Sequence, residues 1–191
     1  MEAPKEWKYV ITQIVADTVE STWPCAKYVV LLCGLPGAGK SIFSGGLAAE
    51  FREAFEKNRG PDDATPEVRV CGSEFHEVHA NLSRGSGQDM AEDDVKLALQ
   101  AADVVVIDEM HLTAADRQPI IAVVTSEWAK IGCEGAVYTI KLSCRDEAHA
   151  LELNERSRRP LPRATVRALF QKFADDTEVP AFTVESFAQP E

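Results

Sequence analysis

"GLPGAGKS", residues 34–41, is the stretch that decides the fold of this chain. Gly34, Gly39, Lys40 and Ser41 occupy the fixed positions of the pattern G-x-x-x-x-G-K-[ST]. Glycines in this pattern let successive backbone N–H groups turn inward onto a phosphate, and the helix that follows presents the positive end of its dipole to the same point. The motif therefore predicts a phosphate-binding loop between a strand and a helix.

The sequence on both sides of this loop supplies the expected strand and helix. The preceding run "KYVVLLC" (27–33) is continuously apolar, which is typical of a parallel strand buried on both faces. The following residues repeat apolar side chains at helical spacing through Phe43, Leu47, Phe51 and Phe55. A chance glycine-rich turn would not require this context, so a nucleotide-binding loop is the favoured interpretation.

The loop is expected to bind the phosphates of a nucleoside triphosphate. Lys40 would reach the β- and γ-phosphates and Ser41 would bind Mg²⁺. The guanine-reading motif N-K-x-D is absent from the sequence, which favours ATP. The predicted nucleotide-binding residues are Gly34, Pro36, Gly37, Ala38, Gly39, Lys40, Ser41 and Ile42.

A second buried strand, "VVVID" (104–108), ends in acidic residues. An Asp at the end of a strand beside the phosphate loop can hold Mg²⁺, and Asp108 is the candidate. The residues "DEMH" (108–111) also match the D-E-x-H pattern of helicases, in which Glu109 would activate water. The chain after this motif is too short for the second motor domain that a helicase usually needs, so a kinase is favoured over a motor.

Strands and helices alternate along the rest of the chain. Further strands are expected at 68–75, 135–143 and 181–187, and helices at 5–20, 93–102, 113–132, 145–157 and 165–175. This alternation predicts an α/β fold with a doubly wound, mostly parallel five-stranded sheet and helices on both faces. We expect one domain over 1–191, with an N-terminal amphipathic helix and linker over 1–24.

The segment "RSRRPLPRATVR" (156–167) contains five arginines and no acidic residue. Pro160 and Pro162 interrupt the helical pattern, which predicts a lid over 154–167 between two helices. Arg156 and Arg159 would close over the triphosphate and neutralise the charge that develops on the transferred group. The alternative is a solvated arginine face without a catalytic role.

The three motifs, in this order, resemble those of the small P-loop kinases that include bacteriophage polynucleotide 5′-hydroxyl kinase and the zeta toxins. The resemblance covers residues 27–187. It implies phosphoryl transfer to a hydroxyl acceptor, and it implies a strand-end Asp that accepts the proton of that hydroxyl. This chain has "VCGSEF" (70–75) at that place, so Glu74 is the candidate base, with His76 and His79 nearby. His111 stands where the group often has an Asn.

The expected activity is ATP-dependent transfer of the γ-phosphoryl group to a hydroxyl acceptor, with a nucleic acid 5′-hydroxyl as one candidate. A small-molecule or nucleotide kinase, and an ATPase or nucleotide-controlled binding protein, are the alternatives. The catalytic residues would be Lys40, Glu74, Asp108, Arg156 and Arg159, and the metal ligands Ser41 and Asp108.

Composition limits the partners and the compartment. The net charge of −11 argues against nonspecific binding of duplex nucleic acid, which depends on Lys and Arg. No apolar run approaches the roughly 20 residues needed to span a bilayer, so no membrane partner is expected. The N-terminus lacks the order of a secretory signal and the five cysteines are widely spaced, which favours free thiols in the cytoplasm.

Overall fold

The computed structural model describes residues 5–22, 26–58, 66–72, 87–157, 160–177, 180 and 182–185. Its centre is a five-stranded sheet with the strand order β2-β3-β1-β4-β5, in which each neighbouring pair is parallel. The strands are β1 (Ala26–Cys33), β2 (Val68–Gly72), β3 (Val104–Asp108), β4 (Glu134–Ser143) and β5 (Phe182–Glu185). The predicted five-stranded α/β sheet is therefore confirmed.

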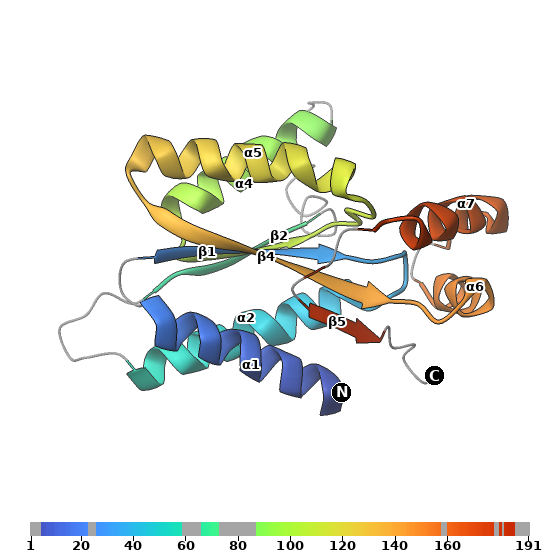
Figure 1. Cartoon of the computed structure of the whole chain (residues 1–191), viewed down its shortest axis with the longest axis horizontal. Helices are drawn as coiled ribbons and strands as arrows, with labels where there is room; N and C mark the ends of the chain where they lie inside the picture. Colours follow the sequence, from blue (N-terminus) through green and yellow to red (C-terminus); the bar gives the residue numbers. More distant parts are fainter. Residues whose placement is uncertain are drawn as a thin grey trace.

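Helices cover both faces of the sheet, and two more lie at one end of it (Figure 1). One face carries α1 (Lys5–Thr22) and α2 (Lys40–Asn58), and the opposite face carries α4 (Gly87–Ala101) and α5 (Ala114–Ile131). The last two helices, α6 (Glu147–Glu155) and α7 (Arg163–Ala174), lie beyond the carboxyl ends of β1 and β4. None of the helices in these ranges is long and apolar enough to cross a membrane.

The alternation of side chains along the central strands produces two cores, one on each face. In β1, Val30 and Leu32 pack toward α1 and α2, whereas Val29 and Leu31 pack toward α4 and α5. This is the period of two expected when successive Cβ atoms point to opposite faces. All four side chains are fully buried. The continuous apolar run that predicted a strand buried on both faces is thus explained.

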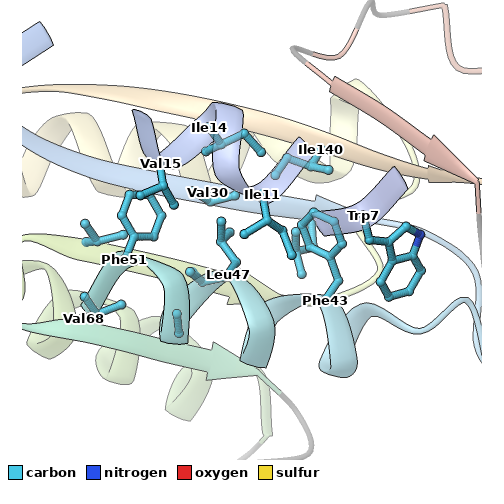
Figure 2. Packing of buried hydrophobic residues seen from close by; sticks show 14 of the residues in the cluster. Trp7, Ile11, Ile14, Val15, Val30, Phe43, Leu47, Phe51, Val68 and Ile140 are labelled. Carbon is cyan, nitrogen blue, oxygen red and sulfur yellow. The ribbon is translucent and has the colours of Figure 1, made fainter. Parts of the chain in front are cut away.

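The N-terminal helix supports the helix that follows the phosphate loop. Trp7, Ile11, Ile14 and Val15 form the buried stripe of α1 and pack on α2 and the sheet (Figure 2). The rings of Trp7 and Phe43, which lies in the first turn of α2, form a T-shaped pair with centroids 5.4 Å apart. The amphipathic helix predicted from residue 5 is confirmed, and its apolar stripe fixes the start of α2.

Both ends of α5, which was predicted over 113–132, are capped. Thr113 and Asp116 form a reciprocal capping box at the N-terminus, and Gly132 ends the helix in the left-handed conformation at φ 65°. Asp116 also forms an ion pair with Lys172 of α7, with Nζ and Oδ1 2.8 Å apart. The first turn of α5 is therefore linked to the end of α7.

A buried ion pair strengthens this link between α5 and the end of α7. Arg117 Nη2 lies 2.9 Å from Asp176 Oδ2, and the two side chains are only 2% and 4% exposed. Asp176 Oδ1 also accepts from the backbone N–H of Ala114, and Arg117 donates to the carbonyl of His111. Burial alone raises the pKa of the Asp176 carboxyl, but the hydrogen bonds from Arg117 and the Ala114 N–H, together with the charge of Arg117, outweigh it and hold that pKa below its usual range.

Replacing Asp176 by Asn should destabilise the protein strongly, because it leaves a buried guanidinium without its counter-charge. We expect a loss of about 3–5 kcal/mol in the free energy of unfolding, measured by chemical denaturation near neutral pH. The difference in free energy of unfolding between the wild type and this variant should be complete above the usual carboxyl pKa of about 3.9. It should shrink as the pH falls through the lower pKa of Asp176 in the folded state.

The exposed pair between Arg163 and Glu155 offers a matched control, since its side chains are 67% and 57% exposed. Replacing Glu155 by Gln should change the free energy of unfolding by less than about 1 kcal/mol. Equal losses for the two variants would contradict a special role for the buried pair.

Candidate nucleotide-binding site

The glycines of the phosphate loop adopt the conformations that the motif requires. Gly37 and Gly39 have positive φ values of 78° and 87°, which side chains with a Cβ rarely adopt. Short-range hydrogen bonds fix the turn, with Ala38 N donating to Leu35 O at 3.1 Å and Phe43 N donating to Gly39 O at 3.0 Å. Residues 34–41 thus form a compact backbone bend that leads directly into α2.

Lys40 lies against this bend. Its ammonium donates to the carbonyl oxygens of Gly34 and Leu35, at 3.1 Å each. These bonds hold the charged end of the side chain at the phosphate loop instead of in open solvent. A phosphate that approaches the loop would meet this positive charge together with the N-terminal end of α2.

Asp108 lies beside the loop because β3 is the direct neighbour of β1. The register pairs Asp108 with Leu32, two residues before the loop begins. Ser44 Oγ lies 3.3 Å from Asp108 Oδ2 and 3.1 Å from Ser41 O, so the carboxylate is next to the first turn of α2. Asp108 is only 5% exposed. The structure therefore brings the two predicted metal ligands, Ser41 and Asp108, into the same part of the fold.

The chemistry of these side chains suits Mg²⁺. A hydroxyl and a carboxylate are hard oxygen donors, and Mg²⁺ commonly takes only one or two protein ligands beside phosphate oxygens and water. Within the described ranges no group of three or more His, Cys, Asp or Glu side chains could hold a metal by itself. A magnesium ion here would therefore depend on the phosphates for part of its coordination.

The end of α6 presses directly on the phosphate loop. A Cβ atom placed on Gly37 would lie 2.1 Å from the carbonyl oxygen of Leu153 and 3.2 Å from the backbone nitrogen of Asn154. Such distances leave no room for any side chain at position 37. A third apolar cluster joins the same parts, since Leu35 of the loop packs with residues of α6 and α7, including Ala150, Leu151 and Val166.

Arg156, which follows α6, and the two arginines of α7 form ion pairs with acidic residues of α6. Arg156 Nη2 lies 2.8 Å from Glu152, Arg163 lies 2.8 Å from Glu155 and Arg167 lies 2.7 Å from Glu147. The acidic partners come from the helix before the arginine-rich segment, so the segment taken alone suggested a more basic surface than the fold provides. Arg156 follows the last turn of α6, one helical turn from the contact between Leu153 and the loop.

Several predicted site residues lie outside the described part of the chain. These are the candidate base Glu74, the nearby His76 and His79, and Arg159 of the predicted lid. Their roles stay predictions.

His111 occupies a special position between the strand-end acids and α5. Its φ is 36°, the only positive value among the described residues other than glycine. Burial lowers the pKa of its imidazole, and its Nδ1 is buried without a hydrogen-bond partner in the described ranges. Its neighbour Met110 accepts a hydrogen bond from Gly34 N at 3.1 Å, which ties the segment after β3 to the start of the loop. The motif D-E-x-H marked this position, but its conformation could not be read from the sequence.

The comparisons with known proteins are limited to structural likeness. No protein-family model matches the chain, and no curated protein matches it in sequence. The crystal structure of Chaetomium thermophilum Kti12 in complex with ADP-AlF3 is similar over 85% of this chain and 91% of that one, with a TM-score of 0.57 and 14% identity. At such identity the likeness shows the fold alone.

Two kinases are similar at lower scores. A gluconokinase from Sinorhizobium meliloti covers 86% of this chain and 84% of its own, with a TM-score of 0.47 and 16% identity. Shikimate kinase from Bacteroides thetaiotaomicron covers 83% and 86%, with a TM-score of 0.46 and 11% identity. Together with the strand order, the likeness to Kti12 shows that this chain has the α/β fold with a five-stranded parallel sheet that P-loop NTPases share.

Replacing Gly37 by Ala should weaken nucleotide binding, because the positive φ alone costs roughly 1–2 kcal/mol and the new methyl would also collide with the Leu153 carbonyl. We expect at least about a tenfold loss of ATP affinity, which corresponds to 1.4 kcal/mol. Calorimetric titration measures it.

Gly45 provides the same substitution at a harmless place. It lies inside α2 with nothing within 4 Å of an added Cβ. Replacing Gly45 by Ala should keep ATP affinity and stabilise the helix by roughly 0.5–1 kcal/mol. If both variants bound ATP like the wild type, the close approach at Gly37 would be irrelevant to the site.

Replacing Asp108 by Asn should remove the dependence of ATP binding on magnesium, because a neutral amide is a poorer ligand for Mg²⁺ than a carboxylate. ATP titrations with and without Mg²⁺ should differ for the wild type and coincide for the variant. Replacing the exposed Asp175 by Asn should leave the magnesium effect intact. A variant at Asp108 with a full magnesium effect would remove this residue from the metal site.

Proposed function

We propose that this protein transfers the γ-phosphoryl group of ATP to a hydroxyl group. The observation that carries the proposal is the convergence of three parts at one loop. The phosphate loop holds the Lys40 ammonium, the Asp108 carboxylate of the neighbouring strand contacts Ser44 near the start of α2, and the end of α6 contacts Gly37. Phosphoryl transfer depends mainly on positioning and charge neutralisation, which these parts can supply.

Each of these residues has a role that follows from its position. The backbone N–H groups of the loop and the Lys40 ammonium bind the phosphate oxygens and orient the γ-phosphoryl group. Bound Mg²⁺, held by Ser41 and Asp108, would neutralise phosphate charge. Arg156 lies beyond the last turn of α6, from where its guanidinium can exchange the Glu152 carboxylate for a phosphate oxygen. Glu74 is proposed to accept the proton of the acceptor hydroxyl, as the resemblance to small P-loop kinases implies.

The charges favour a small acceptor over a nucleic acid. Arg156, Arg163 and Arg167 are each paired with a carboxylate of α6, and the chain carries a net charge of −11. A nucleic acid strand would need positive charge along its backbone path. We therefore place a small hydroxyl compound or a nucleotide first, with a polynucleotide 5′-hydroxyl as the second candidate.

A transfer assay with γ-labelled ATP tests this proposal. The purified protein is incubated with sugars, hydroxy acids, nucleosides and 5′-hydroxyl oligonucleotides. Label should move to a small compound in the wild type. Replacing Lys40 by Ala should reduce the rate at least about a thousandfold, equivalent to roughly 4 kcal/mol of barrier. Replacing the exposed Lys57, which pairs with Glu53, should leave the rate unchanged.

The products separate the alternatives. Label on an oligonucleotide would favour the second candidate, whereas release of free phosphate without any labelled acceptor would indicate an ATPase that uses Glu109 to activate water. Transfer that survives the loss of the Lys40 side chain would overturn the assignment of the site.

A further inference from the structure

Asn154, in the last turn of α6, is one of the few buried polar side chains of the described chain. It is only 2% exposed. Its side-chain amide forms two hydrogen bonds with the backbone of Leu161. Nδ2 donates to Leu161 O at 2.9 Å, and Oδ1 accepts from Leu161 N at 2.8 Å. Two antiparallel backbone residues exchange the same pair of hydrogen bonds. The side chain of Asn154 therefore makes the hydrogen bonds to Leu161 that a neighbouring antiparallel strand would make. These bonds join the end of α6 to the chain that leads into α7.

The end of α6 and the chain at Leu161, which Asn154 joins, both pack near the phosphate loop. The carbonyl of Leu153, one residue before Asn154, occupies the space beside Gly37. Leu161 packs on the apolar cluster that contains Leu35 of the loop and Leu112 of the segment after β3. The amide of Asn154 thus fixes the chain on both sides of Arg156 relative to the bend of the loop.

We propose that Asn154 is a positioning residue that holds Arg156 next to the phosphate loop, so that its guanidinium reaches the γ-phosphate of bound ATP. This inference rests on the proposed phosphoryl transfer. Arg156 N donates to Glu152 O at 3.3 Å and Ser157 N to Asn154 O at 3.0 Å, so the backbone around Arg156 stays tied to α6. Without the Asn154 amide, the chain after Arg156 loses its anchor at Leu161 and is held only where it leaves α6. A segment held at one end samples many more conformations than a segment held at both ends.

Two variants test this role. Replacing Asn154 by Ala removes both hydrogen bonds to Leu161, and replacing it by Asp removes the donor and turns a carboxylate oxygen toward the Leu161 carbonyl. Asn58 at the end of α2 provides the control, because it is exposed and donates only to Ala54 O. Replacing Asn58 by Ala should leave every measured quantity at the wild-type value.

The first measurement requires no enzymatic activity. Trypsin cleaves after Arg156, and the rate of cleavage between Arg156 and Ser157 reports how firmly this segment is held. We expect both Asn154 variants to be cleaved there at least about tenfold faster than the wild type, while cleavage after Lys57 stays unchanged. ATP should slow the cleavage after Arg156 in the wild type and lose this effect in the variants. Wild-type cleavage rates in both variants would overturn the proposal.

The second measurement separates positioning from general stability. Binding of ATP and of ADP is titrated, and the transfer rate is measured at saturating ATP. The variants should keep ADP affinity within about twofold but lose the additional affinity for ATP, with kcat lowered about 10- to 100-fold because small misplacements near the reacting group cost that much. Equal losses of affinity for ADP and ATP would refute the proposal that Asn154 positions Arg156. An unchanged kcat together with faster trypsin cleavage would refute it as well. If the wild type transfers no phosphoryl group, the proposed function fails, and protection of Arg156 by ATP still decides the role of Asn154.

Discussion

The close approach between Gly37 and the carbonyl of Leu153 is the contact on which the rest of the candidate site depends. Only a residue without a Cβ can adopt the positive φ of this position and leave room for the backbone of α6. The phosphate loop is consequently enclosed between the carboxyl edge of the sheet and the end of α6. Arg156, the residue that follows α6, is three residues along the chain from this contact.

The α6–α7 pair belongs to the framework of the site, because several independent links hold it in place. Apolar side chains join it to Leu35 and Leu112, and the ion pair between Asp116 and Lys172 joins it to the first turn of α5. The buried pair of Arg117 and Asp176 fixes the chain just beyond α7. Arg117 is thus held in the framework by Asp176 and the carbonyl of His111.

Local signals predicted most of the fold. Uninterrupted aliphatic runs marked β1 and β3, and the helical spacing of Phe43, Leu47, Phe51 and Phe55 marked α2. Each of these signals depends on a few neighbouring residues, so it can be read without knowing the fold. The surroundings of the site were harder to predict from the sequence. The acidic partners of Arg156, Arg163 and Arg167 lie in the preceding helix. The conformation of His111 and the burial of Asn154 have no local sequence pattern.

By itself the sequence determined that a glycine-rich bend follows a buried strand, since the spacing of its glycines acts through the backbone conformation of eight consecutive residues. The tertiary structure decided which side chains surround that bend. Placing β3 next to β1 brought Asp108 to Ser44, and folding α6 across the strand ends brought Leu153 to Gly37 and Asn154 to Leu161. These contacts join residues far apart in the chain or across an intervening loop, and their distances follow from packing, which no local pattern of residues encodes.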